Sequence, residues 1–218
     1  MSLPTVTARE RMLKNIRKAL IEKRDNPWPE LDPTPLYKEN LQGNEIMFAE
    51  ELTRVGGNFI YCDSEINLVE SLLSLVQDHQ WKNLATGDPG LLTFLDEFEF
   101  PYTSGPLAVL DAAASVTLCD ALVARNGSVL ISTGVVSGRQ LMIFPPVHIV
   151  VAHSSQLVTD IKDGLQLVSK KYKRIPSSIT LITGPSRTAD IEKTLVLGAH
   201  GPKELYVFFL DTEERFIF

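Results

Sequence analysis

Apolar and polar side chains follow two different periods along this chain, and the change of period predicts alternating helices and strands. We expect a helix where apolar residues recur every three or four positions, and a strand where a short apolar run stands between turn residues. In the first half the pattern gives helices at residues 45–55, 63–79 and 89–95, and strands at residues 58–62 and 82–86. Such repeated strand–helix units favour an α/β fold with a mostly parallel sheet that helices cover on both faces.

The second half contains more strand-like runs. The turn Arg125-Asn126-Gly127 between two apolar runs is typical of a hairpin. Ser154 or Ser155 is suited to cap a helix that reaches about residue 171. The expected strands lie at residues 118–124, 128–132, 139–144, 148–152, 178–183 and 205–210. The last of these runs is apolar enough for the inside of the sheet.

The first 25 residues differ from the rest of the chain in charge. They contain seven lysines and arginines and three acids, a net charge of +4, whereas the whole chain carries −6 and the remainder therefore −10. Leu13, Ile16 and Leu20 recur at helical spacing, and Thr7 is suited to cap the helix, so we expect a basic amphipathic helix. It is either a solvated helix that rests on the body of the protein or a docking arm for an acidic partner.

Four prolines between residues 26 and 35 predict an extended connector after this helix, because proline fixes φ and lacks a backbone donor. The sequence therefore divides into an N-terminal helix with its connector at residues 1–43 and an α/β domain at residues 44–218.

Composition and charge exclude several classes of protein. The chain has 27 acidic and 21 basic residues, and this excess of acids disfavours a nucleic-acid-binding surface, which needs clustered lysine and arginine. No apolar run approaches the roughly 20 residues of a membrane span, and the start lacks a secretory signal, so we expect a cytoplasmic protein. Two cysteines cannot supply the four thiolates of a typical iron–sulfur cluster.

The strongest candidate site is the run Gly-Pro-Ser-Arg-Thr-Ala-Asp-Ile-Glu at residues 184–192, directly after an expected strand. We expect it to open a helical turn whose free N–H groups bind an anion beyond the carboxyl end of that strand. Gly184 lets a ligand approach the backbone, and the guanidinium of Arg187 suits a carboxylate or phosphate. Three further side chains of the run can either cap the helix or hold the ligand: Ser186, Thr188 and Asp190.

A second glycine-bearing loop, Gly198-Ala199-His200-Gly201-Pro202, precedes the last expected strand. His200 between glycines is suited to act as an acid, a base or a hydrogen-bond donor, or to bond a neighbouring loop. Because the two loops flank one expected short helix, they can meet at one edge of the sheet. Gly201 would then contribute to the same anion site.

Other polar residues carry weaker signals. Arg139, next to Gly138, could supply a second anion contact, whereas His148 opens an apolar strand and is expected in the core or at its edge. His148 and His153 are five positions apart on that strand, so their side chains point to opposite faces. No cluster of histidine, cysteine and carboxylate residues has the spacing of a zinc site, and we expect no metal.

The two glycine-bearing motifs, followed by the terminal apolar strand, resemble the lactate-utilisation (LUD) domain family. Gly138-Arg139, Pro145 and residues 148–151 also stand where that family has similar residues. The resemblance covers roughly residues 45–211. It implies an open three-layer α/β/α fold like that of sugar-phosphate isomerases and coenzyme A transferases.

The resemblance also implies a function. Members of the family are linked to the oxidation of L-lactate to pyruvate beside partner subunits that carry iron–sulfur clusters, so no cofactor is expected in this chain. One residue departs from the family pattern. The family commonly has an acid in an Ala-Glu-Thr-Gly-like turn, where this chain has Arg125, and the local charge is reversed.

Three hypotheses follow for the function. In the first, Arg187 holds the carboxylate of a small 2-hydroxy acid with help from Arg139, and His200 and Asp190 are the candidate catalytic residues. In the second, the protein is a non-catalytic module that supports assembly of the iron–sulfur subunits. In the third, it is a stand-alone transferase or isomerase that acts on a phosphorylated or acyl-CoA anion. The oligomeric state stays open, with a homo-oligomer as one option.

Overall fold

The computed structural model describes residues 7–21, 42–105, 107–135, 138–191 and 194–211 of the 218-residue chain. The chain divides into two compact units, Met1–Glu39 and Asn40–Phe218. The expected proline-rich connector at residues 26–35 lies outside the described residues. Within the described ranges, none of the helices has the length and apolar character needed to cross a membrane.

In the first unit, α1 (Ala8–Ile21) is the expected basic helix. The Oγ1 of Thr7 accepts a hydrogen bond from the backbone N–H of Glu10 at 3.2 Å, and the Glu10 carboxylate accepts one from the backbone N–H of Thr7 at 2.9 Å. This reciprocal capping box satisfies N–H groups that lack partners at a helix start, and it confirms the predicted cap. Met12, Ile16 and Leu20 form one exposed apolar side of the helix.

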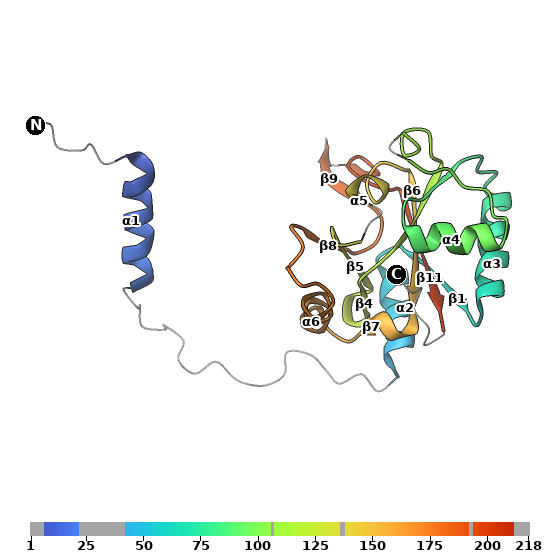
Figure 1. The fold of residues 1–218 in the computed structure, drawn as a ribbon, viewed down its shortest axis with the longest axis horizontal. Coiled ribbons are helices and arrows are strands. Elements are labelled where there is room, and N and C mark those ends of the chain that lie inside the picture. Colours follow the sequence, from blue (N-terminus) through green and yellow to red (C-terminus); the bar gives the residue numbers. More distant parts are fainter. Residues whose placement is uncertain (1–6, 22–41, 106, 136–137, 192–193, 212–218) are drawn as a thin grey trace, which may run out of the picture. The chain divides into compact units, whose positions relative to one another are not determined.

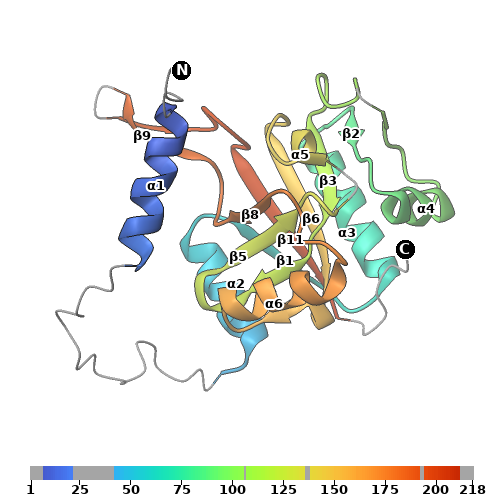
Figure 2. The same cartoon turned by 60° about the vertical axis from the view of Figure 1, so that its left-hand side comes forward.

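Five strands form the main sheet of the second unit (Figure 1), in the order β1-β11-β6-β3-β2, and all five are labelled in Figure 2. In this spatial order their bounds are Asn58–Cys62, Glu204–Leu210, Val147–His153, Ala114–Leu118 and Leu84–Ala85. All four neighbouring pairs are parallel, which confirms the predicted mostly parallel sheet of an α/β fold. β11 lies between β1 and β6, in agreement with its apolar run.

Two helices cover one face of this sheet. α3 (Glu65–Asp78) starts at Ser64, whose Oγ accepts a hydrogen bond from the backbone N–H of Asn67 at 3.2 Å. α4 (Pro89–Glu97) starts at Asp88, which caps it through the N–H of Gly90 at 3.2 Å. Both helices lie on the same side of the sheet (Figure 2). The helices predicted at residues 63–79 and 89–95 are confirmed.

The opposite face is covered by α2 (Asn44–Arg54) and by a second, smaller sheet. Phe48 of α2 meets Phe59 of β1 edge-on, with ring centroids 6.0 Å apart. Because Asn58 is paired with Tyr206, Phe59 and Tyr206 point to opposite faces of the main sheet. The three layers are therefore α3 with α4, the main sheet, and α2 with the second sheet.

The second sheet has four strands in the order β7-β4-β5-β8. Its strands are β7 (Leu157–Val158), β4 (Ala121–Val123), β5 (Ser128–Ser132) and β8 (Ile179–Ile182). β4 and β5 form the predicted antiparallel hairpin around the 3₁₀ turn η1 (Ala124–Asn126). α6 (Ile161–Lys171) packs against β4.

Three expected elements differ in the structure. The run at residues 118–124 is divided, because the chain leaves the main sheet after β3 and enters the second sheet as β4. Residues 154–156 form a 3₁₀ turn, η2, and the helix begins later at Asp160, whose carboxylate supplies the cap. Residues 139–144 are not a strand, since α5 (Gly138–Leu141) occupies the start of this segment.

Candidate functional site

The segment after β8 is a hairpin and not the expected helix. β9 (Arg187–Ile191) pairs antiparallel with β10 (Thr194–Leu197), and Thr188 lies opposite Val196. The segment is rich in β-branched residues, which favour strands. The expectation that a helix N-terminus near Gly184 holds an anion is therefore wrong, because this helix does not exist.

The two glycine-bearing loops do meet, as the sequence predicts. The backbone N–H of Ser186 donates to the carbonyl oxygen of Pro202 at 2.8 Å, and the N–H of Gly198 donates to the oxygen of Ser186 at 2.9 Å. A Cβ on Gly201 would lie 3.1 Å from the Cβ of Ser186, so the loops are in close contact. His200, in the second loop, is exposed. We call these two segments, residues 184–187 and 198–202, the glycine-loop pair.

The Arg187 side chain bonds to the C-terminal end of α2. Its Nη2 donates a hydrogen bond to the carbonyl oxygen of Val55, 2.6 Å away. Val55 ends α2, where carbonyl groups lack partners and the helix dipole favours a cation. Gly184 allows this approach: its φ is +78°, and a Cβ there would collide with the same oxygen. The exposed Arg187 side chain thus stabilises the end of a helix.

The glycine-loop pair lies at the amino ends of the parallel strands and not at the expected carboxyl ends. The N–H of Lys203, just before β11, donates to the oxygen of Pro146, just before β6, at 2.7 Å. Nearby, Nδ2 of Asn58 at the start of β1 donates to the oxygen of Leu205 at 3.3 Å. The strand that leads into the pair, β8, belongs to the second sheet and runs antiparallel to β5. The rule that ligands bind at carboxyl ends therefore does not apply to it.

The remaining predicted site residues have diverse surroundings. Thr188 is half-buried on β9, and Asp190 lies on the same strand, where its side chain is outside the description. Arg139 is exposed on α5, in the connection that leads to β6. The structure brings Ser186 next to Gly201 and places Gly184 and Arg187 against Val55, and the roles assigned to these residues stay predictions.

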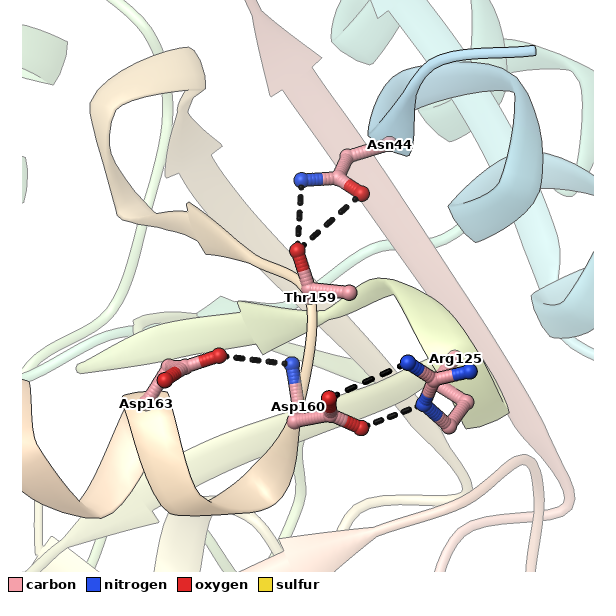
Figure 3. A network of polar contacts seen from close by, with 5 residues as sticks. All are labelled: Asn44, Arg125, Thr159, Asp160 and Asp163. Carbon is pink, nitrogen blue, oxygen red and sulfur yellow. Dashed lines mark hydrogen bonds and ion pairs between the residues drawn. The ribbon is translucent and has the colours of Figure 1, made fainter. Parts of the chain in front are cut away.

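Arg125, which the resemblance places where an acid is expected, is held by an ion pair (Figure 3). Its Nη2 donates to Oδ2 of Asp160 at 3.1 Å and its Nε donates to Oδ1, so the pair is bidentate. These hydrogen bonds lower the pKa of Asp160. The backbone N–H of Arg125 also donates to the oxygen of Thr159, whose Oγ1 accepts from Nδ2 of Asn44. One network thus ties the η1 turn, the start of α6 and the start of α2.

The same turn is covered by α2. Gly127, with φ of +59°, follows η1, and a Cβ there would collide with the backbone nitrogen of Leu52 in the last turn of α2. Only glycine permits this approach of helix and turn. The surroundings of Arg125 and Gly127 therefore hold the η1 turn, α2 and the start of α6 together.

A polar cluster that the sequence analysis missed lies where β3 ends. The Asp120 side chain is 0% exposed and accepts three hydrogen bonds: from the N–H of Ser132 at 2.7 Å, from the hydroxyl of Tyr172 at 2.7 Å and from Nζ of Lys171 at 3.2 Å. Burial, followed by the hydrogen bond to Asp120, raises the pKa of Tyr172. An acid inside an apolar run was the available signal, but its two side-chain partners, Lys171 and Tyr172, are 51 and 52 residues away in sequence.

Neither cysteine is suited to ligate a metal. Cys62 and Cys119 are buried, and burial raises the pKa of both thiols, that of Cys62 to about 11. The thiolate is the form that binds metals, and raising the pKa disfavours it. Across the described ranges of the chain, no group of three or more histidine, cysteine, aspartate or glutamate side chains could hold an ion.

Known proteins resemble this chain in sequence and in fold. The LUD domain matches residues 107–210. Proteins named lactate utilization protein C are 31% identical over 62% of this chain and 65% of the Halalkalibacterium halodurans protein, and 30% identical over 67% of this chain and 70% of the Geobacillus sp. (strain WCH70) protein. That of Macrococcus caseolyticus is 27% identical over 89% of this chain and 90% of its own length.

A solved structure supports the fold. The crystal structure of a DUF162 family protein from Deinococcus radiodurans superposes with a TM-score of 0.57 and 16% identity, over 77% of this chain and 96% of that one. At this identity the likeness concerns the fold alone. The sequence relatives, the matched domain and the mostly parallel α/β architecture agree, and the chain belongs to the LUD domain family, as a relative of the bacterial lactate utilization protein C.

Proposed function

We propose that this protein is a component of a lactate-utilisation system, in which it takes part in the oxidation of L-lactate to pyruvate and binds a small carboxylate. The observation that carries the proposal is family membership, since relatives that align with most of this chain are named lactate utilization protein C. The parallel sheet supports it, because such sheets bind small ligands at the carboxyl ends of their strands.

Within this function the chain acts beside partner subunits that carry iron–sulfur clusters. Oxidation of L-lactate to pyruvate releases two electrons and two protons, so an electron acceptor is required. The thiols of Cys62 and Cys119 are buried and have raised pKa values, which makes them poor cluster ligands. We therefore assign the electron acceptor to the partners and a non-redox role to this chain.

The glycine-loop pair supports the assembly role better than substrate binding. Arg187 is engaged with Val55, and the helix that was to bind the anion is a hairpin. β9 and β10 form a separate two-stranded sheet, and Leu197 at its end is 49% exposed. An exposed hairpin edge of this kind is suited to pair with another chain. The hairpin and His200 are thus candidates for contact with the partner subunits.

Growth on a defined carbon source tests the proposed function. Deleting the encoding gene should abolish growth on L-lactate and leave growth on pyruvate, the product of the oxidation, unchanged. The full-length gene supplied on a plasmid should restore growth on L-lactate. Unimpaired growth of the deletion strain on L-lactate would contradict the proposal. If sugar phosphates or acyl-CoAs, and not small carboxylates, raise the thermal stability of the purified protein, the stand-alone transferase or isomerase hypothesis takes its place.

A further inference from the structure

The main sheet has a topological switch point between β2 and β3. After β2 the chain passes to α4, which lies on the helical face of the sheet, and after β3 it passes to β4 in the second sheet on the opposite face (Figures 1 and 2). β2 and β3 are neighbours and run parallel. In open α/β sheets, ligands bind at the carboxyl ends of two neighbouring strands whose connections leave on opposite faces.

Polar and charged residues converge at these two carboxyl ends. Thr86 and Asp88 follow β2, and Asp120 follows β3. Lys171 and Tyr172, from the end of α6, bond to Asp120. We call these five residues the β2–β3 carboxyl edge. They come from three separate parts of the chain, and the fold alone brings them together.

Two groups in this cluster retain unused hydrogen-bonding capacity. The Lys171 ammonium has three donor hydrogens, and its contacts with Asp120 and the Tyr172 side chain leave at least one of them for a ligand. The Lys171 side chain is 45% exposed, so a ligand can reach it. Thr86 is 2% exposed, and its Oγ1 has no hydrogen-bond partner among the residues that the structure describes. An unbonded buried hydroxyl is costly to keep.

Electrostatics keep a cation in place beside a second acid. Burial works to lower the pKa of Lys171, but the charge of Asp120 and contacts with Tyr172 outweigh it, and the pKa is raised overall. Lys171 is also close enough to Asp88 to lower the pKa of that carboxyl, although burial raises it on balance. The ammonium therefore stays charged beside the buried Asp120 carboxyl, and its charge also acts on the buried Asp88 carboxyl.

We propose that the β2–β3 carboxyl edge binds a small 2-hydroxy carboxylate. The Lys171 ammonium donates a hydrogen bond to the ligand's carboxylate, and the Asp88 carboxylate accepts one from the ligand's hydroxyl. The N-terminus of α4, which begins at Asp88, favours negative charge at the same place. Asp120 and Tyr172 are positioning residues that hold the Lys171 side chain. The choice of a hydroxy acid rests on the proposed function, whereas the location rests on the geometry alone.

Amine footprinting of the full-length protein tests the location without any substitution. Acetylation of each lysine by acetic anhydride is followed by mass spectrometry, with L-lactate absent or titrated to saturation. Lys170 is the internal control, because it is the neighbouring exposed residue on α6. L-Lactate should slow the acetylation of Lys171 and leave that of Lys170 unchanged. Equal rates at Lys171 with and without L-lactate would overturn the proposal.

Calorimetric titration of variants tests the chemistry. Lys171→Met should weaken L-lactate binding about tenfold or more, since a hydrogen bond to a charged group is lost, and Lys170→Met should bind like the wild type. Asp88→Asn should weaken L-lactate binding but not binding of propionate, which has the same carboxylate and no hydroxyl. Lys171→Met leaves the Asp120 carboxylate without its cation, so each variant's melting temperature is measured alongside. If Lys171→Met does not fold, Asp88→Asn and the footprinting decide.

The outcomes separate this inference from the proposed function. Loss of growth on L-lactate in the deletion strain, together with unprotected Lys171, refutes the site and keeps the function. Protection of Lys171 by inorganic phosphate and not by L-lactate keeps an anion site at this edge and refutes the hydroxy acid. If L-lactate protects Lys171 in the purified protein but the deletion strain still grows on L-lactate, the site is kept and the proposed function alone is refuted.

Discussion

Nε2 of His148 lies 2.8 Å from Oγ1 of Thr117, and both side chains are buried between the neighbouring strands β6 and β3. The other ring nitrogen, Nδ1, has no hydrogen-bond partner among the residues that the structure describes. Burial lowers the pKa of His148 to about 4, because a charged imidazolium would lose its hydration inside the protein. The histidine expected in the core is there, and it is neutral in the folded protein at neutral pH.

The neutral state of His148 predicts a loss of stability in mild acid. The free energy of unfolding should fall as the pH is lowered from 6.5 toward 4, because the unfolded chain binds a proton on His148 in this range and the folded protein does not. The loss attributable to this residue reaches about 3 kcal/mol. Urea unfolding of wild type and His148→Leu at pH 7.5 and pH 5 measures it. An equal loss in both proteins would contradict the prediction, since other titrating groups act on both alike.

Gly127→Ala should destabilise the protein strongly. The new Cβ would collide with the backbone of α2 at Leu52, and α2 would have to move away from the η1 turn. We expect a loss of about 2–3 kcal/mol in the free energy of unfolding. Gly105→Ala is the matched control, because Gly105 also has a positive φ, of 103°, but nothing lies within 4 Å of its added Cβ. Similar losses for both variants in chemical unfolding would show that α2 does not seal the turn.

The ion pair of Arg125 and Asp160 should show measurable coupling. A double-mutant cycle with Arg125→Ala and Asp160→Asn removes each charge, and asparagine keeps the ability to cap α6. Because the pair is partly exposed, we expect a coupling free energy of about 0.5–1 kcal/mol that shrinks as salt is added. The cycle is measured by chemical unfolding at low and high ionic strength. Additive effects at low salt would contradict the network of Figure 3.

Arg187→Ala should weaken the end of α2. The substitution removes the hydrogen bond to Val55 and the favourable charge at the helix C-terminus, at an exposed position, so we expect a loss of about 1 kcal/mol. Arg187→Lys keeps the charge and should recover part of that loss. Thermal unfolding of the three proteins measures the effect. Unchanged stability in Arg187→Ala would free this guanidinium for the ligand-binding role that the sequence first suggested.

The strands of the main sheet could be predicted because their apolar runs are continuous and bounded by turn residues. Residues 148–152 and 205–210 illustrate this, and both lie inside the parallel sheet. The errors came where one pattern serves two structures. The apolar run through Cys119 and Asp120 continues across the passage from one sheet to the other, and nothing in its period marks the change.

The candidate sites were harder to predict than the fold. Glycine and proline correctly placed the turn at Gly184, but they did not reveal that a hairpin follows, because β-sheet pairing depends on a partner strand. The contact between Ser186 and Gly201 could be anticipated, since a short segment joins the two loops. The bond between Asp120 and Lys171 joins residues 51 positions apart, and it exists only after both sheets have formed.

The place of β11 has a consequence for biosynthesis. Among the described strands, β1 pairs with β11 alone. Asn58 therefore has no partner until Tyr206, which the ribosome adds 148 residues later, has been synthesised. Until residues 204–210 leave the exit tunnel, the edges of β1 and β6 that pair with β11 both lack a neighbouring strand. A nascent chain that stalls before this point exposes two strand edges that can pair with other chains, and we expect chaperones to bind it there.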